Sequence, residues 1–73
     1  MEHPIAQLVD VRDMLCAQAL AVVAQVLPSL PSGTWIAVRY STDDVRRDLA
    51  AWAAERGYTT HERDSATLRI DKP

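Results

Sequence analysis

The sequence has little cysteine and no excess of positive charge. Cys16 is the single cysteine in 73 residues. One cysteine cannot form an internal disulfide, whereas secreted domains of this size usually carry several, so we expect a reducing cytoplasm. The formal net charge is -2. Since neutralisation of phosphates dominates nucleic-acid affinity, we expect no direct binding to RNA or DNA.

Long apolar runs are also missing. A membrane-spanning helix needs about 20 apolar residues, and the longest candidate, residues 15–30, is interrupted by two glutamines, a proline and a serine. Residues 1–4 lack the positive charge of a signal peptide. A chain this short buries only about 60% of the surface that its unfolded form exposes. We therefore expect residues 1–73 to form one domain, without a membrane span, that works at its surface rather than in a deep pocket.

Metal ligands are scarce as well. The two histidines, His3 and His61, and the single cysteine do not show the spacing of a metal site. We expect no metal, and no motif in the sequence indicates a cofactor.

The hydrophobic pattern that is present predicts four strands and two helices in the order βαβαββ. Strands are expected at about Gln7–Val11, Thr34–Tyr40, Tyr58–Glu62 and Ala66–Asp71. Helices are expected from near Cys16 to about Leu27 and over Asp43–Arg56. Prolines stop the first helix, Ser41 is interpreted as a cap of the second, and Gly57 ends the second. Arg63–Ser65 is the expected turn of the last hairpin.

The order of these elements predicts the fold class. Two consecutive βα units favour parallel strands joined by a right-handed crossover. The last hairpin must add an antiparallel pair, so the sheet is mixed. Apolar and polar residues alternate in residues 34–40 and 66–71, which indicates a sheet with one face on helices and one in solvent. We therefore predict an α/β (α+β) two-layer sandwich with a mixed four-stranded sheet and both helices on one face.

The residues around Cys16 carry a family resemblance. Asp10, Arg12, the apolar pair Met14-Leu15 and Cys16 precede the first predicted helix. Further similarity is found in the turn Leu30-Pro31-Ser32-Gly33, in Arg47-Asp48-Leu49, and at Trp52 and Gly57. With these features the chain resembles the TusA/SirA family of small sulfur carriers over roughly Gln7 to Ile70.

The sequence departs from the family motif at three positions near the cysteine. The family has a glycine where this chain has Asp13, and its Cys-Pro-x-Pro motif is replaced by alanines at Ala17 and Ala19. An aspartate before the helix is a good cap, so we expect Asp13 to cap it and the helix to begin at Met14.

The resemblance implies that Cys16 accepts sulfane sulfur as a persulfide. The donor would be a cysteine desulfurase or a rhodanese-like protein, and the persulfide would pass to an acceptor protein. Such a stoichiometric carrier is labelled a sulfurtransferase by family habit. Asp10, Arg12 and Asp13 are candidates for support of Cys16 or for partner contact. The helix dipole and the free amides favour a thiolate, whereas the Asp13 carboxylate opposes one. Because the backbone groups act at closer range, we expect the pKa of Cys16 to lie below the ordinary value of about 8.5.

Several alternatives stay open from the sequence. The chain is alternatively a non-catalytic interaction or regulatory module that has lost efficient sulfur transfer, or a thiol redox sensor. Cys16 itself is then a small buried apolar residue, and Arg12 a solvated loop cation. Arg46 and Arg47 either dock an acidic partner or form local ion pairs. Trp35 is either a partner contact or a cover for the open sheet.

Overall fold

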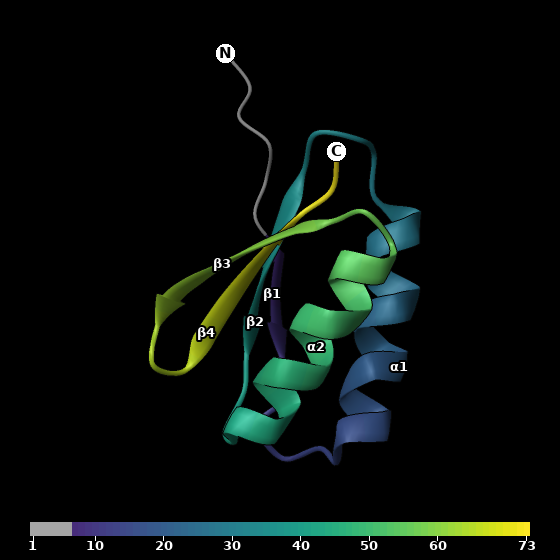
Figure 1. The fold of residues 1–73 in the computed structure, drawn as a ribbon. Helices are drawn as coiled ribbons and strands as arrows, with labels where there is room; N and C mark the ends of the chain where they lie inside the picture. The colour runs from purple at the N-terminus through teal and green to yellow at the C-terminus, as the bar shows by residue number, and fades with distance from the viewer. Residues whose placement is uncertain (1–6) are drawn as a thin grey trace.

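The computed structural model describes residues 7–73 and has the predicted order of elements (Figure 1). Its strands are β1 (Gln7–Asp10), β2 (Trp35–Arg39), β3 (Thr59–Asp64) and β4 (Thr67–Asp71). Its α-helices are α1 (Cys16–Val26), which continues into the 3-10 turn η1 (Leu27–Ser29), and α2 (Asp43–Glu55).

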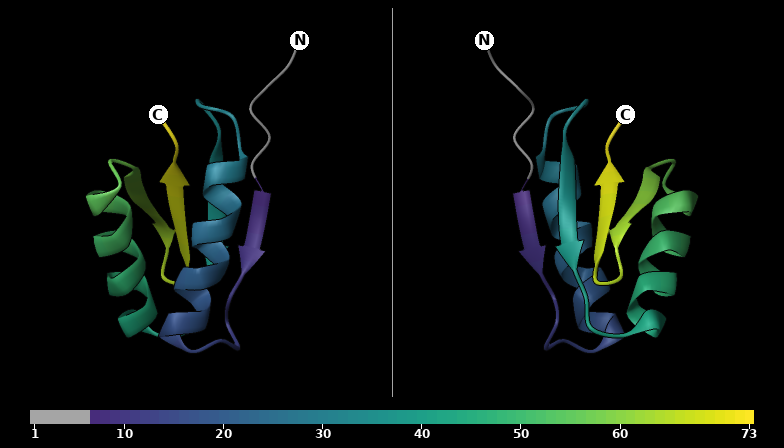
Figure 2. Two further views of the ribbon diagram at one scale, coloured as in Figure 1. Left: turned by 90° about the vertical axis from the view of Figure 1, so that its right-hand side faces the viewer. Right: turned by 90° about the vertical axis from the view of Figure 1, so that its left-hand side faces the viewer.

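The four strands form one mixed sheet in the order β1-β2-β4-β3. β1 is parallel to β2, whereas β4 is antiparallel to both β2 and β3. Both helices lie on the same side of this sheet, and no helix of residues 7–73 covers the other side (Figure 2). The predicted two-layer α/β sandwich is therefore confirmed.

The core lies between the sheet and the two helices. Alternate residues of the central strands point into it, and on α2 the spacing of four residues keeps one stripe buried. The buried residues are Val9, Val11, Ala19, Val23, Leu27, Ile36, Val38, Tyr40, Val45, Leu49, Ala53, Leu68 and Ile70. Val11 follows β1 but still donates its N–H to the Arg39 carbonyl oxygen at 2.9 Å. The pairing thus continues to the residue at which strand one was predicted to end.

The end of α1 is fixed by a lysine that is distant in sequence. Lys72 Nζ donates to the carbonyl oxygens of Leu27 (3.0 Å), Pro28 (3.3 Å) and Leu30 (2.5 Å). A cation is favourable at this end of a helix, where carbonyl groups lack helical partners. Of the helices in residues 7–73, none is long and apolar enough to span a bilayer.

The hairpin turn lies later than predicted, so the expected turn at Arg63–Ser65 is wrong. β3 continues to Asp64, and the turn consists of Ser65 and Ala66. A register shift between Glu62 and Asp64 places an extra residue in β3. The Asp64 carboxylate accepts a hydrogen bond from the N–H of Ala66 at 2.8 Å, so a side chain satisfies this backbone amide of the turn.

Candidate functional site around Cys16

Cys16 is the first residue of α1, so the cysteine lies at the start of the first helix, as the sequence predicts. Its side chain is partly buried and packs against the core, so it is neither fully exposed nor an interior residue. Leu15, the residue before it, is the N-cap and is 75% exposed. The Leu15 N–H donates to Gln18 Oε1 at 3.1 Å, which satisfies one of the free amides at the start of the helix. Cys16 thus lies at a helix N-terminus beside an exposed apolar side chain.

Asp10 and Arg12 are paired with each other at the start of the loop that leads to Cys16. Arg12 donates through Nε to Asp10 Oδ1 at 3.0 Å and through Nη2 to Asp10 Oδ2 at 2.8 Å. The Arg12 backbone N–H also donates to Asp10 Oδ1 at 3.1 Å. The Arg12 side chain holds the pKa of the Asp10 carboxyl at about 2. Both side chains therefore shape the loop, and the guanidinium is paired with Asp10 rather than with the sulfur.

Asp13 does not cap α1, which corrects the prediction that the helix would begin at Met14. Asp13 lies in the exposed turn before the helix, two residues ahead of the N-cap Leu15. The turn is closed by the Met14 N–H, which donates to the Val11 carbonyl oxygen at 3.1 Å. The helix therefore starts two residues later than predicted, and the N–H of its N-cap, Leu15, is bonded to the Gln18 side chain rather than to the Asp13 carboxylate.

Ser41 has a different role from the predicted cap of α2. Its hydroxyl donates to the carbonyl oxygen of Arg12 at 2.5 Å and so joins the β2–α2 loop to the β1–α1 loop. Thr42 is the N-cap of α2, and its Oγ1 accepts the Val45 N–H at 3.4 Å. Figure 1 shows these two loops at the same end of the molecule, where both helices begin.

The pKa of the Cys16 thiol is raised, which corrects the prediction of a lowered value. Partial burial is the largest cause, and interactions with the Asp48 carboxylate and then with Asp44 raise the pKa further. The backbone amide of Cys16 itself acts in the opposite direction but more weakly. The carboxylates responsible come from α2, not from Asp13. At neutral pH the isolated protein therefore holds mainly the protonated thiol.

Sequence reasoning missed Asp48 as part of this site. Asp44 and Asp48 are separated by four residues on α2, a spacing that places them on one helix face. That spacing is the signal available in the sequence. The spacing shows that the two carboxylates lie on the same side of α2, but it does not show that this side of the helix is the one near Cys16.

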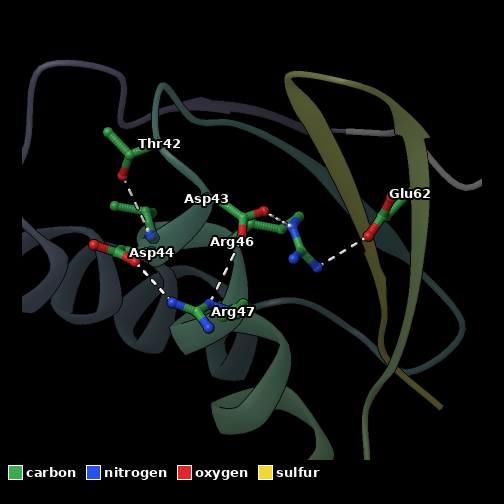
Figure 3. A network of polar contacts seen from close by, with 7 residues as sticks. Thr42, Asp43, Asp44, Arg46, Arg47 and Glu62 are labelled. Atoms are coloured by element: carbon green, nitrogen blue, oxygen red, sulfur yellow. Dashed lines mark hydrogen bonds and ion pairs between the residues drawn. The ribbon is translucent and has the colours of Figure 1, made fainter.

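The arginines of α2 are engaged in ion pairs near the helix start (Figure 3). Arg46 contacts Asp43 at 2.6 Å and Glu62 of β3 at 3.0 Å. Arg47 contacts Asp44 at 2.9 Å and Asp43 at 3.6 Å. These contacts favour the local-pair alternative over an acidic docking partner. The exposed pairs of Arg47 contribute little stability, about 0–1 kcal/mol.

The open face of the sheet carries Trp35 between two arginines. The guanidinium of Arg69 lies 4.2 Å from the ring centroid and that of Arg63 lies 5.5 Å away. Arg69 is paired in turn with Asp71, at 2.5 Å between Nε and Oδ1. Trp35 is only partly exposed as a result. The arrangement favours the interpretation that Trp35 covers the sheet, because its ring is already in contact with two side chains of the same chain.

A metal centre or an enclosed substrate site is not formed by the part of the chain described here. Residues 7–73 contain no group of three or more His, Cys, Asp or Glu side chains that could hold a metal ion. His3 lies outside the described residues, and His61 lies on β3. No pocket is found in residues 7–73 either.

Comparisons with known proteins found no relative of this chain. No family model, no curated protein and no solved structure matches this sequence or its fold.

Proposed function

We propose that this chain is a sulfur carrier, which accepts sulfane sulfur as a persulfide on Cys16 and passes it to an acceptor protein. The observation that carries the proposal is the place of Cys16, a partly exposed cysteine as the first residue of a helix. Free amides and the positive end of the helix dipole at this position favour an anionic sulfur, although burial and the α2 carboxylates outweigh this effect in the free protein. The resemblance of residues 10–16 to the TusA/SirA motif supports the same function.

The proposed transfer is balanced without an added oxidant. The Cys16 thiolate attacks the terminal sulfur of a persulfide on the donor, and a new S–S bond forms while the donor's own S–S bond breaks. The donor cysteine leaves as a thiolate, and the proton of the Cys16 thiol passes to solvent. We propose a cysteine desulfurase or a rhodanese-like protein as the donor, in the cytoplasm. The exposed Leu15 beside Cys16 is available for contact with either partner.

A second candidate function is a non-catalytic interaction or regulatory module on the same fold. The observation that favours it is the raised pKa of the Cys16 thiol. Burial of the thiol is the largest cause, and two carboxylates of α2 raise the pKa further. The alanines at positions 17 and 19 favour it as well, because proline is preorganised for the first turn of a helix. A thiol that is mainly protonated attacks a persulfide slowly, because thiolate is the nucleophile.

Mass spectrometry of the intact protein after incubation with a persulfide donor separates these functions. The carrier is expected to gain one sulfur atom on Cys16, and the Cys16→Ser variant is expected to gain none while its circular dichroism spectrum stays unchanged. The added sulfur should leave on treatment with a thiol reductant. An unchanged wild-type mass supports the interaction module, and oxygen adducts on Cys16 in place of sulfur support a redox sensor.

A further inference from the structure

We propose that the outer face of α1 is the contact surface of a weak homodimer, in which two copies of this chain pack their α1 helices antiparallel across a two-fold axis near Ala21. The inference does not depend on the proposed function, because it uses only the side of α1 that points away from the sheet.

The segment that contains α1 has no charge. No charged residue occurs between Asp13 and Arg39, although charged residues make up 25% of the chain. α1 lies within this segment and has the sequence CAQALAVVAQV. A helix at the surface of a globular protein normally carries charged or strongly polar residues on the side that faces solvent. Packing against the sheet therefore explains the apolar inner side of α1 but not the missing charge on its outer side.

The outer face of α1 is exposed in the single chain. It consists of the exposed residues Ala17, Gln18, Ala21 and Gln25, with the partly exposed Val22 and Ala24 beside them. No other element of residues 7–73 lies over this side of the helix (Figure 2). At its N-terminal end the face continues to Leu15, which is 75% exposed and lies three residues before Gln18. An uncharged surface that ends in a large exposed apolar side chain is typical of a contact with another protein.

α2 shows how a solvent-facing helix of the same chain is composed. Seven of its residues are exposed, and five of these are charged: Asp43, Asp44, Arg47, Asp48 and Glu55. None of the four exposed residues of α1 is charged. Both helices lie on the same side of the sheet (Figure 2). Their different composition therefore distinguishes a helix that faces water from one whose outer side is suited to a protein contact.

A second copy of the chain fits the outer face of α1 in charge. When a surface meets its own copy across a two-fold axis, the residue on the axis faces itself. A charged residue there would face a like charge, whereas the outer face of α1 brings no charge to the contact. Antiparallel packing also sets the N-terminus of each helix beside the C-terminus of the other, which is the favourable arrangement of two helix dipoles. Leu15 of one copy then lies near the exposed and uncharged Pro28 and Ser29 of the other.

The size of the outer face sets the strength of the dimer. The 11 residues of α1 form a helix about 16 Å long and about 10 Å wide. Two such surfaces bury less than about 1,200 Å² in total, which is the range of weak and transient contacts. We therefore expect a dissociation constant of about 0.1–1 mM. The dilute chain is then a monomer, in which Leu15 remains accessible to other proteins.

The test is sedimentation equilibrium of the full chain from about 10 µM to about 1 mM, which includes the expected dissociation constant. A thiol reductant is present throughout, so that a disulfide between two Cys16 side chains cannot imitate the contact. The wild type should change from the monomer mass toward twice that mass as the concentration rises. Ala21→Glu should raise the dissociation constant at least about tenfold, because it places two carboxylates together at the axis.

Two further variants separate a contact of α1 with its own copy from a general effect of surface charge. Ala51→Glu is the matched control, because Ala51 is an exposed alanine of α2, and it should associate as the wild type does. Ala21→Lys alone should stay monomeric, as Ala21→Glu does. An equimolar mixture of the two Ala21 variants should associate at least as strongly as the wild type, because opposite charges then meet at the axis. Circular dichroism shows which variants are folded, and either Ala21 variant alone is sufficient to test the loss of the dimer.

The inference is overturned if the wild type keeps the monomer mass at every concentration, which would leave the outer face to a different protein or to solvent. It is equally overturned if Ala51→Glu weakens association as much as Ala21→Glu, or if the mixture of folded Ala21 variants stays monomeric. Sedimentation requires no sulfur donor, so failure of wild-type sulfur loading would refute the proposed function without affecting this result.

Discussion

Replacement of Lys72 by methionine tests how the end of α1 is held. Methionine keeps most of the apolar stem but removes the ammonium that donates to three carbonyl oxygens, those of Leu27, Pro28 and Leu30. A single hydrogen bond to a charged group contributes about 1.5–3 kcal/mol. The three bonds share one ammonium, and after its loss water reaches the carbonyl group of Pro28, so we expect a total cost of about 2 kcal/mol rather than three times the single value.

Urea denaturation followed by circular dichroism measures this cost. With a slope near 1 kcal/mol per molar, the midpoint should fall by about 2 M. The Tm should fall by roughly 8–16 °C, because 1 kcal/mol corresponds to about 4–8 °C in a domain of this size. Arg47→Met is the matched control, since it removes a cation whose ion pairs are exposed, and it should cost at most about 1 kcal/mol. Equal midpoints for the two variants would refute the assignment of Lys72 as the group that holds this end of the helix.

Two further predictions address the core and the loop before the cysteine. Leu49→Ala removes a fully buried side chain of α2 and should lower the free energy of unfolding by about 2–5 kcal/mol, measured by urea denaturation; a cost under 1 kcal/mol would contradict the described packing. Arg12→Gln should return the pKa of Asp10 from about 2 toward its ordinary value near 4, measured by NMR titration of the carboxyl carbon. Because the folded-state pKa is the lowered one, the stabilisation by this pair is present above pH 4 and is lost as the pH falls toward 2, and the variant should lack that acid dependence.

The fold could be predicted because its signals are local. The alternation of Leu68 and Ile70 with polar neighbours identifies β4, and the spacing of Val45 and Leu49 identifies the buried face of α2. The hairpin turn was misplaced because its position depends on a side chain. The Asp64 carboxylate binds the Ala66 N–H, and the register shift in β3 absorbs the extra residue. A bulge has no signature in the hydrophobic pattern.

The position of Cys16 could be predicted from the sequence, but the electrostatic environment of its thiol could not. Cys16 was located correctly because a strand, a loop and a helix follow one another along the chain. The raised pKa of its thiol comes from burial and from Asp48 and Asp44, which reach Cys16 only after α1 and α2 have packed together. Similarly, the bond from Ser41 to Arg12 joins two loops that a strand and a helix separate in sequence. Such tertiary contacts have no local pattern, so the sequence favoured the nearest carboxylate, Asp13, instead.

The strand order has a consequence for the folding route. β4 lies between β2 and β3, and among the described strands β3 pairs with β4 alone. The β3–β4 hairpin has a two-residue turn and can form within microseconds, as hairpins do. The parallel β1–β2 pair, in contrast, requires α1 to cross over first and is intrinsically slower. The described chain is therefore expected to assemble from two locally ordered halves, β1-α1-β2 and the hairpin, with the β2–β4 pairing as the step that joins them and closes the core.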